Sequence, residues 1–167
     1  DELNFSDTYS MADIMHAADI VNFSIENGKK IAVYGDYDCD GVTATAMLYT
    51  YLKSRNANCI YYIPDRFQEG YGMNCNAVEY LKDIDSDYDL IILDPPAFAK
   101  HHKVLGNALQ GYKRINARAM EKVRPGGILF TFSCSQAVSR DLFRTTIFTS
   151  AAIAKRKVRI IGQLTQP

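Results

Sequence analysis

The chain has 167 residues, enough to bury about two-thirds of its unfolded surface in one domain and few for two. Lysine plus arginine and aspartate plus glutamate each number 19, so no overall charge attracts nucleic acid and such binding needs a local patch. The cysteines lack the spacing of a zinc site or a disulfide framework, the longest apolar runs are strand-sized, and no signal peptide is evident. We expect a cytoplasmic protein with no membrane segment.

Apolar residues at helical spacing predict a first amphipathic helix over residues 11–25, which Gly28 ends. A β-rich run at residues 30–34 leads into an acidic glycine loop, and helix formers follow. The remaining expected elements are a helix over 42–55, a strand at 58–63, a helix near 75–82, a strand at 90–93, a helix near 107–123, a Pro-Gly-Gly turn at 125–127, a strand at 128–132, a helix over 139–155 and a last strand at 157–161.

Five strands that alternate with helices predict an α/β fold, a three-layer α/β/α sandwich around a mostly parallel, Rossmann-like sheet. In such sheets, ligands bind at the carboxyl ends of the strands. Three loops with chemically useful side chains follow predicted strands, at residues 36–40, 94–98 and 133–135. We therefore expect the functional site at that edge.

Asp36, Asp38 and Asp40 alternate directly after the first predicted strand. Carboxylates gathered in one small volume repel one another unless a cation is bound, and their hard oxygen donors favour Mg²⁺ or Mn²⁺. Gly35 and Gly41 permit a tight backbone path, and the first amides of the next helix would hold a phosphate beside the metal. The alternative for any aspartate-rich loop is a solvated turn or a helix cap.

Residues 31–45 resemble the first motif of the DHH phosphoesterase superfamily, specifically that of the RecJ single-stranded-DNA exonucleases. The resemblance implies that Asp38 and Asp40 bind metal and that Asp36 supports them. Tyr34 stands where many members carry a metal-binding histidine, which weakens one site. Two metals in such a site would activate water and stabilise the leaving oxygen during displacement at phosphorus.

Residues 61–72 resemble the RecJ segment that follows the next strand. By that resemblance, Arg66, Tyr71 and Gly72 lie near the phosphate backbone of a single-stranded nucleic acid. The family then supplies one more aspartate at a strand end and a histidine pair.

Asp94 fits the role of that further aspartate, because it ends the strand at residues 90–93. By the resemblance it would be a third metal ligand with Asp38 and Asp40. His101 and His102 follow Asp94 too closely and without the required strand, so we favour surface positions for them.

From residue 88 the sequence resembles a different family, the RlmI-type class I methyltransferases that modify cytosine C5 in ribosomal RNA. The motif at 88–100 is similar to their substrate-base motif, and agreement continues at 124–129, 132–135, 138–141 and 162–163. In that chemistry Cys134 would attack cytosine C6 as a thiolate, with Asp94 nearby. The residues beside the base and the methyl donor would be Pro95, Pro96 and Phe98.

The methyl donor S-adenosylmethionine has no evident binding half in this chain. The glycine-rich loop that should precede the motif is absent, and the carboxylates at residues 35–41 would repel the carboxylate of the donor. No acidic residue ends the strand at residues 58–63, since Pro64 follows instead. The sequence therefore disfavours binding of this cofactor.

We interpret the chain as a mosaic in one α/β domain, with a RecJ-like half at residues 1–84 and a methyltransferase-like half at 85–167, and we favour an artificial origin. The leading hypothesis is a metal-dependent DHH-type phosphoesterase remnant that uses Mn²⁺ or Mg²⁺ on single-stranded DNA. The alternatives are a methyltransferase fragment that acts on ribosomal RNA and a non-catalytic scaffold. Apolar surface left by missing parental elements would favour a dimer.

Overall fold

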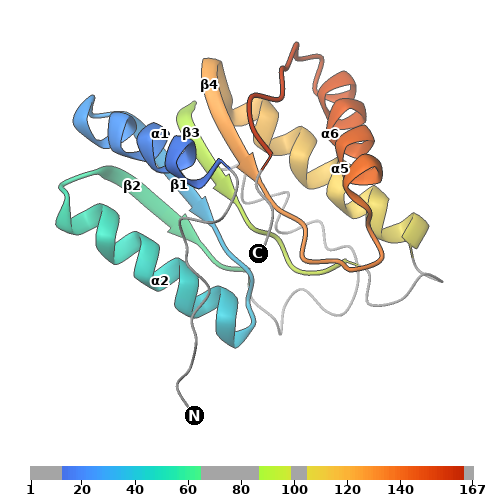
Figure 1. The fold of residues 1–167 in the computed structure, drawn as a ribbon, viewed down its shortest axis with the longest axis horizontal. Coiled ribbons are helices and arrows are strands. Elements are labelled where there is room, and N and C mark those ends of the chain that lie inside the picture. Colours follow the sequence, from blue (N-terminus) through green and yellow to red (C-terminus); the bar gives the residue numbers. More distant parts are fainter. Residues whose placement is uncertain (1–12, 65–86, 99–104, 164–167) are drawn as a thin grey trace.

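The computed structural model describes residues 13–64, 87–98 and 105–163 (Figure 1). Helices alternate with strands along these segments. In chain order the elements are α1 (Ile14–Glu26), β1 (Lys30–Tyr34), α2 (Cys39–Ser54), β2 (Asn58–Tyr62), β3 (Tyr88–Leu93), α5 (Leu105–Lys122), β4 (Val123–Thr131) and α6 (Arg140–Ile153).

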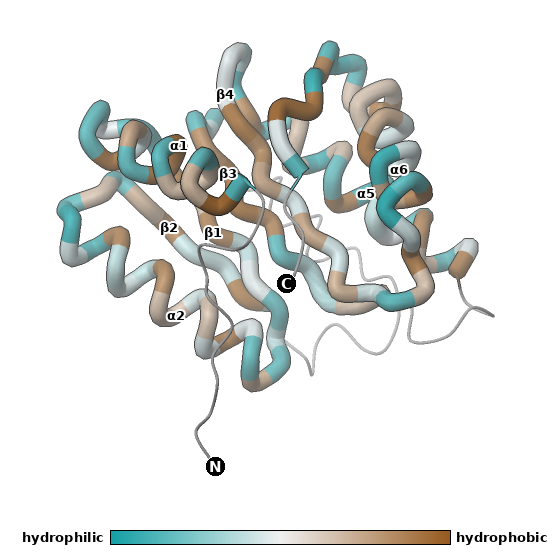
Figure 2. The backbone as a smooth tube through the Cα atoms, in the orientation of Figure 1, coloured by the Kyte–Doolittle hydropathy of each residue, from teal (hydrophilic) through white to brown (hydrophobic). Residues whose placement is uncertain are grey.

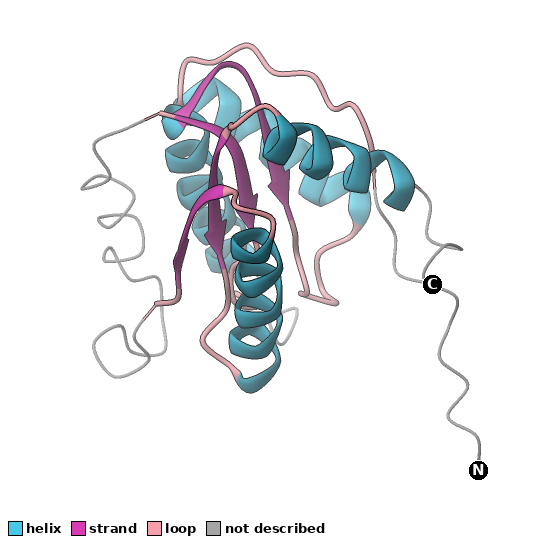
Figure 3. Ribbon diagram, turned by 90° about the vertical axis from the view of Figure 1, so that its left-hand side faces the viewer, coloured by secondary structure: helices cyan, strands magenta, loops and turns pink. Residues whose placement is uncertain are grey.

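The strands form a four-stranded parallel sheet in the order β2-β1-β3-β4. Successive residues of a strand point to opposite faces, so Ile31 and Val33 enter one core cluster while Ala32 and Tyr34 enter another. Helices α1 and α2 pack on the first face, α5 packs on the second, and α6 packs on α5 (Figure 3). The predicted three-layer α/β architecture is confirmed, and apolar residues follow the strands in Figure 2.

The prediction of a fifth strand at residues 157–161 is wrong. The segment is not a strand, and Val158, Ile160 and Ile161 are 37%, 37% and 50% exposed. Branched apolar residues favour a strand only where a neighbouring strand and a packed face exist for them. Within the described residues the sheet ends at β4, and this segment does not join it.

The expected turn at residues 125–127 lies inside a strand. Strand β4 begins at Val123, which pairs with Tyr88, and the next pair joins Ile128 to Leu90, so four residues bulge out of the ladder. Gly126 has a φ of 79°, which favours glycine, and a Cβ on Gly127 would lie 2.8 Å from the carbonyl oxygen of Asp89.

The two predicted halves meet in the centre of the sheet. Strand β1 belongs to the first half and β3 to the second, and they pair directly from Ile31↔Leu90 to Tyr34↔Leu93. The helix predicted near residues 75–82 and most of the predicted join lie outside the described residues. Among the segments that the structure describes, no helix is long and apolar enough to cross a membrane.

Candidate functional site

Backbone hydrogen bonds hold three loops together at the carboxyl edge of the sheet. The amide of Asp94 donates to the carbonyl of Tyr34 at 2.8 Å, and the amide of Phe132 donates to Leu93 at 3.0 Å. The amide of Gly35 donates to Tyr62 at 3.0 Å. The loops after β1, β3 and β4 are therefore held side by side, as the parallel sheet predicts.

Two glycines allow the acidic loop to fold tightly between β1 and α2. A Cβ on Gly35 would overlap Oγ1 of Thr45, and a Cβ on Gly41 would lie 2.5 Å from Cβ of Asp36. Both glycines are thus needed for close approach. The loop returns upon itself here, so its aspartates stay near the strand ends.

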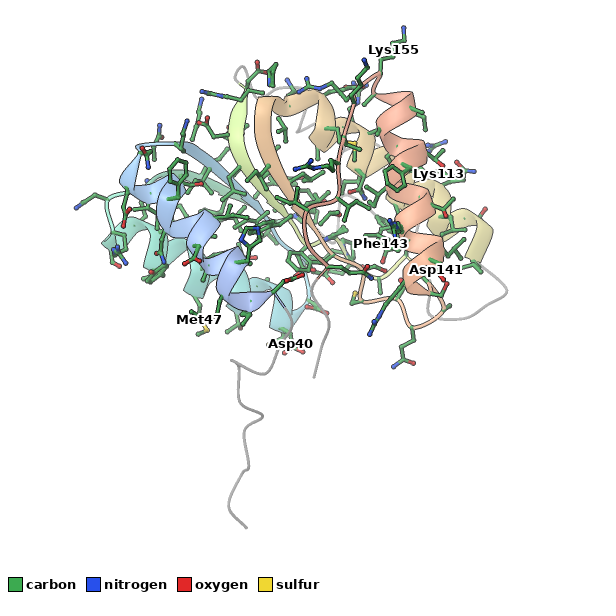
Figure 4. All side chains as sticks on the ribbon, turned by 45° about the horizontal axis from the view of Figure 1, so that its top comes forward. Asp40, Met47, Lys113, Asp141, Phe143 and Lys155 are labelled. Carbon is green, nitrogen blue, oxygen red and sulfur yellow. The ribbon has the colours of Figure 1, made fainter. Side chains whose placement is uncertain are left out.

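The aspartates of this loop have different local roles. Asp38 is the N-cap of α2, and its Oδ1 accepts the amide of Gly41 at 2.7 Å. Oδ1 of Asp36 accepts the amide of Tyr37 at 2.6 Å. Asp40 lies exposed in the first turn of α2, at the edge of the molecule (Figure 4). The helix-cap alternative therefore holds for Asp38, and it leaves the second oxygen of that carboxylate for another partner.

Asp94 faces the acidic loop from the end of β3. Burial raises the pKa of its carboxyl group, and the negative charges of Asp36 and Asp38 raise it further. Three carboxylates therefore lie near the same edge of the sheet, and their hard oxygen donors suit a divalent cation. Asp94 thus adjoins the acidic loop, and its role as a metal ligand stays a prediction.

The carboxylates do not form a closed metal cage. Among the described residues, no three histidine, cysteine, aspartate or glutamate side chains lie close enough together to hold an ion. Tyr34, at the position of the family histidine, is 3% exposed and packs on Tyr62 with ring centroids 5.4 Å apart. Carboxylate oxygens are suitable ligands for a cation. The carboxylates would have to move closer to one another to bind it.

Cys134 adjoins the same acidic cluster from the loop after β4. Although the residue keeps part of its surface exposed, partial burial raises the pKa of its thiol, and the charges of Asp94, Asp36 and Asp38 add to this shift. Side chains from the two separately recognised motifs thus lie near the same edge of the sheet. Their proximity also favours the protonated thiol over the thiolate.

An aromatic pair, Phe98 and Tyr112, packs near this edge of the sheet. Phe98 meets Tyr112 edge to face at 4.8 Å, and the hydroxyl of Tyr112 lies 2.9 Å from Oγ of Ser135. Gly111 allows this aromatic pair to pack closely on α5, since a Cβ at that position would lie 3.0 Å from the Phe98 ring. Sequence reasoning missed Tyr112, and its only signal was an apolar position on an amphipathic helix.

The predicted base-binding residues are packed to different degrees. Pro95 is less than 2% exposed, Pro96 is partly buried, and Phe98 packs against the core on the α5 side. The remaining predicted site residues, and the histidine pair, lie outside the described residues; they are Arg66, Tyr71, Gly72, His101 and His102.

A family model described as DHH family, N-terminal domain, matches residues 30–150. The chain belongs to the DHH family. The match begins at β1 and runs into α6, so it crosses the predicted join between the two halves. The family assignment therefore covers the acidic loop, Asp94 and Cys134.

Curated relatives of this DHH-family chain are of two kinds. The single-stranded-DNA-specific exonuclease RecJ of Bacillus subtilis (strain 168) is 38% identical over 102 residues, which are 61% of the chain and 13% of that protein. The ribosomal RNA large subunit methyltransferase I of Shewanella frigidimarina (strain NCIMB 400) is 45% identical over 85 residues, which are 51% of the chain and 21% of that protein. The chain thus spans about a fifth or less of either relative.

Two solved structures align with most of the chain. A crystal structure of exonuclease RecJ bound to manganese aligns with 85% of the chain and 38% of its own length, with a TM-score of 0.40 and 23% identity. A structure of RecJ in complex with Mn²⁺ from Thermus thermophilus aligns with 85% of the chain and 21% of its own length, with a TM-score of 0.38 and 19% identity.

Proposed function

We propose that this chain retains the divalent-metal site of a DHH-type phosphoesterase and hydrolyses phosphodiesters of single-stranded nucleic acid weakly. The observation that carries the proposal is that a hydrogen bond from the amide of Asp94 to the carbonyl of Tyr34 holds Asp94 beside the acidic loop, where the charges of Asp36 and Asp38 raise the pKa of its carboxyl group. Carboxylates gathered at one edge of a sheet repel one another, and a bound cation would offset that repulsion. The identity to a single-stranded-DNA-specific exonuclease supports the substrate class.

Asp38, Asp40 and Asp94 would hold Mn²⁺ or Mg²⁺, and Asp36 would support them. When bound, the ion would lower the pKa of water and stabilise charge on the leaving oxygen. The N-terminal amides of α2 point toward this edge and favour a phosphate there. Since the histidine partners of the family site are not evident, we expect slow hydrolysis.

Calorimetric titration with Mn²⁺ tests the proposal. The unaltered chain should bind the ion, and Asp94→Asn and Asp38→Asn should each weaken binding by at least about tenfold, since each removes a charged oxygen ligand. Asp38→Asn keeps an oxygen for the helix cap, so its loss of binding does not report unfolding. Asp141→Asn, an exposed change in the first turn of α6, is the matched control.

The outcome that contradicts the proposal is equal Mn²⁺ affinity in the Asp94 and Asp141 variants. Hydrolysis of a labelled oligonucleotide, measured in parallel, should depend on Mn²⁺ and disappear in Asp94→Asn. A folded chain that binds no metal and cleaves no oligonucleotide would support the scaffold hypothesis instead.

An RNA cytosine-C5 methyltransferase fragment is the second candidate, because 85 residues are 45% identical to a ribosomal RNA methyltransferase. The electrostatics oppose it, since burial and three carboxylates raise the pKa of the Cys134 thiol and reduce its thiolate fraction. Calorimetry with S-adenosylmethionine tests this candidate. Donor binding, together with methyl transfer that Cys134→Ala abolishes, would favour it over the phosphoesterase.

A further inference from the structure

A pocket lies at the edge of the sheet opposite the acidic site, where the strands begin. Its volume is about 180 Å³, and it opens between α1 and the bulge of β4. The residues of the pocket on which the inference rests are Phe23, Lys29, Asp89, Arg124 and the glycines of the bulge. None of them belongs to the acidic site, which lies at the other ends of the same strands.

Asp89 holds two cations at the mouth of this pocket. One of its carboxylate oxygens, Oδ2, accepts the backbone amide of Lys30 at 2.7 Å, and the other, Oδ1, lies 3.1 Å from Nη1 of Arg124 and 3.7 Å from Nζ of Lys29. The Asp89 side chain is only 10% exposed, whereas those of Lys29 and Arg124 are 39% and 44% exposed. The carboxylate therefore orients two cations whose outer surfaces still face water.

The bulge of β4 places Arg124 at this mouth. Nη2 of Arg124 also donates to the carbonyl of Asp87 at 3.1 Å, so the guanidinium is fixed at two points. A guanidinium has five N–H donors and an ammonium has three, so both groups retain capacity for an anionic ligand. Gly126 and Gly127 follow without side chains and leave the approach to the cations open.

Phe23 gives the pocket an aromatic surface. It lies in the last turns of α1 and is 59% exposed, a large apolar area for a residue outside the core. Its ring lines the same pocket as the two cations. Exposed aromatic rings beside lysine and arginine are the combination with which proteins bind single-stranded nucleic acid, by stacking bases and attracting phosphates.

Charge around the pocket supports a polyanionic ligand. Lys30 and Lys122 lie at the same edge, and Nη2 of Arg156 donates to the carbonyl of Val123, next to Arg124. Figure 4 shows Lys155 at this end of the molecule and Asp40 at the other. Several cations of the described residues thus gather around the pocket, although Asp87 and Asp89 lie among them.

We propose that this pocket is a docking site for single-stranded nucleic acid, in which Lys29 and Arg124 bind a backbone phosphate and Phe23 stacks on the adjoining base. The site is separate from the acidic cluster and needs no metal. It shares with the proposed function only the class of substrate. It supplies the local basic patch that a chain of zero net charge requires for such binding.

Fluorescence anisotropy with a labelled oligothymidylate, in EDTA, tests this site without any contribution from metal or hydrolysis. Lys29→Ala and Arg124→Ala should each weaken binding and reduce the slope of log affinity against log salt by about 0.7, the value for one phosphate contact on a single strand. Arg124→Lys should restore the slope. Phe23→Ala should weaken binding by about tenfold and leave the slope unchanged, because stacking releases no counterions.

Lys113→Ala, the same charge change on α5, is the matched control and should leave binding unchanged (Figure 4). Thermal melts of each variant separate lost binding from unfolding. Equal losses in the Lys113 and Lys29 variants would overturn the proposal, as would an unchanged affinity in Phe23→Ala.

Displacement of the oligonucleotide by polyglutamate at equal charge concentration would identify a surface for acidic polypeptides instead. Asp94→Asn should keep this binding, so failure of the metal site and failure of the docking site are distinguishable.

Discussion

Gly35 shows how one missing side chain shapes the acidic site. It follows β1 directly, and a Cβ there would overlap Oγ1 of the buried Thr45. We predict that Gly35→Ala lowers the free energy of unfolding by about 1–3 kcal/mol, the usual cost of overpacking. Urea denaturation measures it.

Gly106→Ala is the control for this change, since a Cβ at that position meets nothing within 4 Å and alanine favours the helix. Thr45→Ala in the Gly35→Ala background should recover part of the loss, because it removes the overlapping oxygen. Full stability in Gly35→Ala alone would contradict the packing described for this loop.

The buried hydroxyl of Tyr112 makes the stability of the folded chain depend on pH in the alkaline range. Burial raises the pKa of its hydroxyl above the ordinary value of 10.0, so the folded state holds the proton more firmly than the unfolded state. This contribution is complete below pH 10 and is lost as pH rises through the higher pKa of the folded state. We predict that stability falls above pH 10 and falls less steeply in Tyr112→Phe.

Urea titrations at pH 8 to 11 compare the two proteins, and the difference between them isolates Tyr112 from the other tyrosines. At pH 8 the Phe variant should be less stable by about 1 kcal/mol, since it loses the hydrogen bond to Ser135. Parallel pH profiles for the two proteins would contradict this assignment.

At the scale of elements, helix α2 depends on the same residue that we propose as a metal ligand. Oδ1 of Asp38 caps the helix through the amide of Gly41. We predict that Asp38→Ala lowers the free energy of unfolding by about 1 kcal/mol without metal, whereas Asp38→Asn changes it by a few tenths, because asparagine is an equally good cap. Thermal unfolding in EDTA measures both, and equal losses would show that charge, not capping, sets the effect.

Sequence patterns predicted the elements whose signal is local. The strands at residues 30–34 and 90–93 carry the apolar runs of a sheet buried on both faces, and α2 follows its acidic loop as expected. The bulge of β4 was not predicted, because its register depends on pairing with β3. The segment at 157–161 has strand-like composition and no strand partner, and composition alone does not supply one.

The candidate site was also predicted only in part, because a local sequence pattern does not contain the order of the strands. Each motif gave its own residues, and the parallel sheet placed Asp94 beside the acidic loop. The influence of those carboxylates on the Cys134 thiol depends on strand order, which neither motif contains. The docking pocket depends on a salt-bridged Asp89 and a bulge, both of which are tertiary features.

At the scale of the whole molecule, the central pairing of β1 with β3 predicts that the two halves unfold together. Leu90 is 0% exposed, pairs with Ile31 on one side and Ile128 on the other, and belongs to the core cluster under α1 and α2. Leu90→Ala should therefore lower the free energy of unfolding by about 2–5 kcal/mol. Because the cavity lies between both halves, hydrogen exchange should quicken to a similar extent in β1 and in β4.

Hydrogen exchange followed by mass spectrometry separates this expectation from a two-domain chain. Ile161→Ala, at a residue that is 50% exposed, is the control and should change neither strand by more than about 0.5 kcal/mol. If Leu90→Ala loosened β4 while β1 and β2 kept their protection, the halves would be independent folding units. Equal loss in both would mean that segments resembling two families depend on one shared core, so that neither the acidic site nor the docking pocket persists when either half is removed.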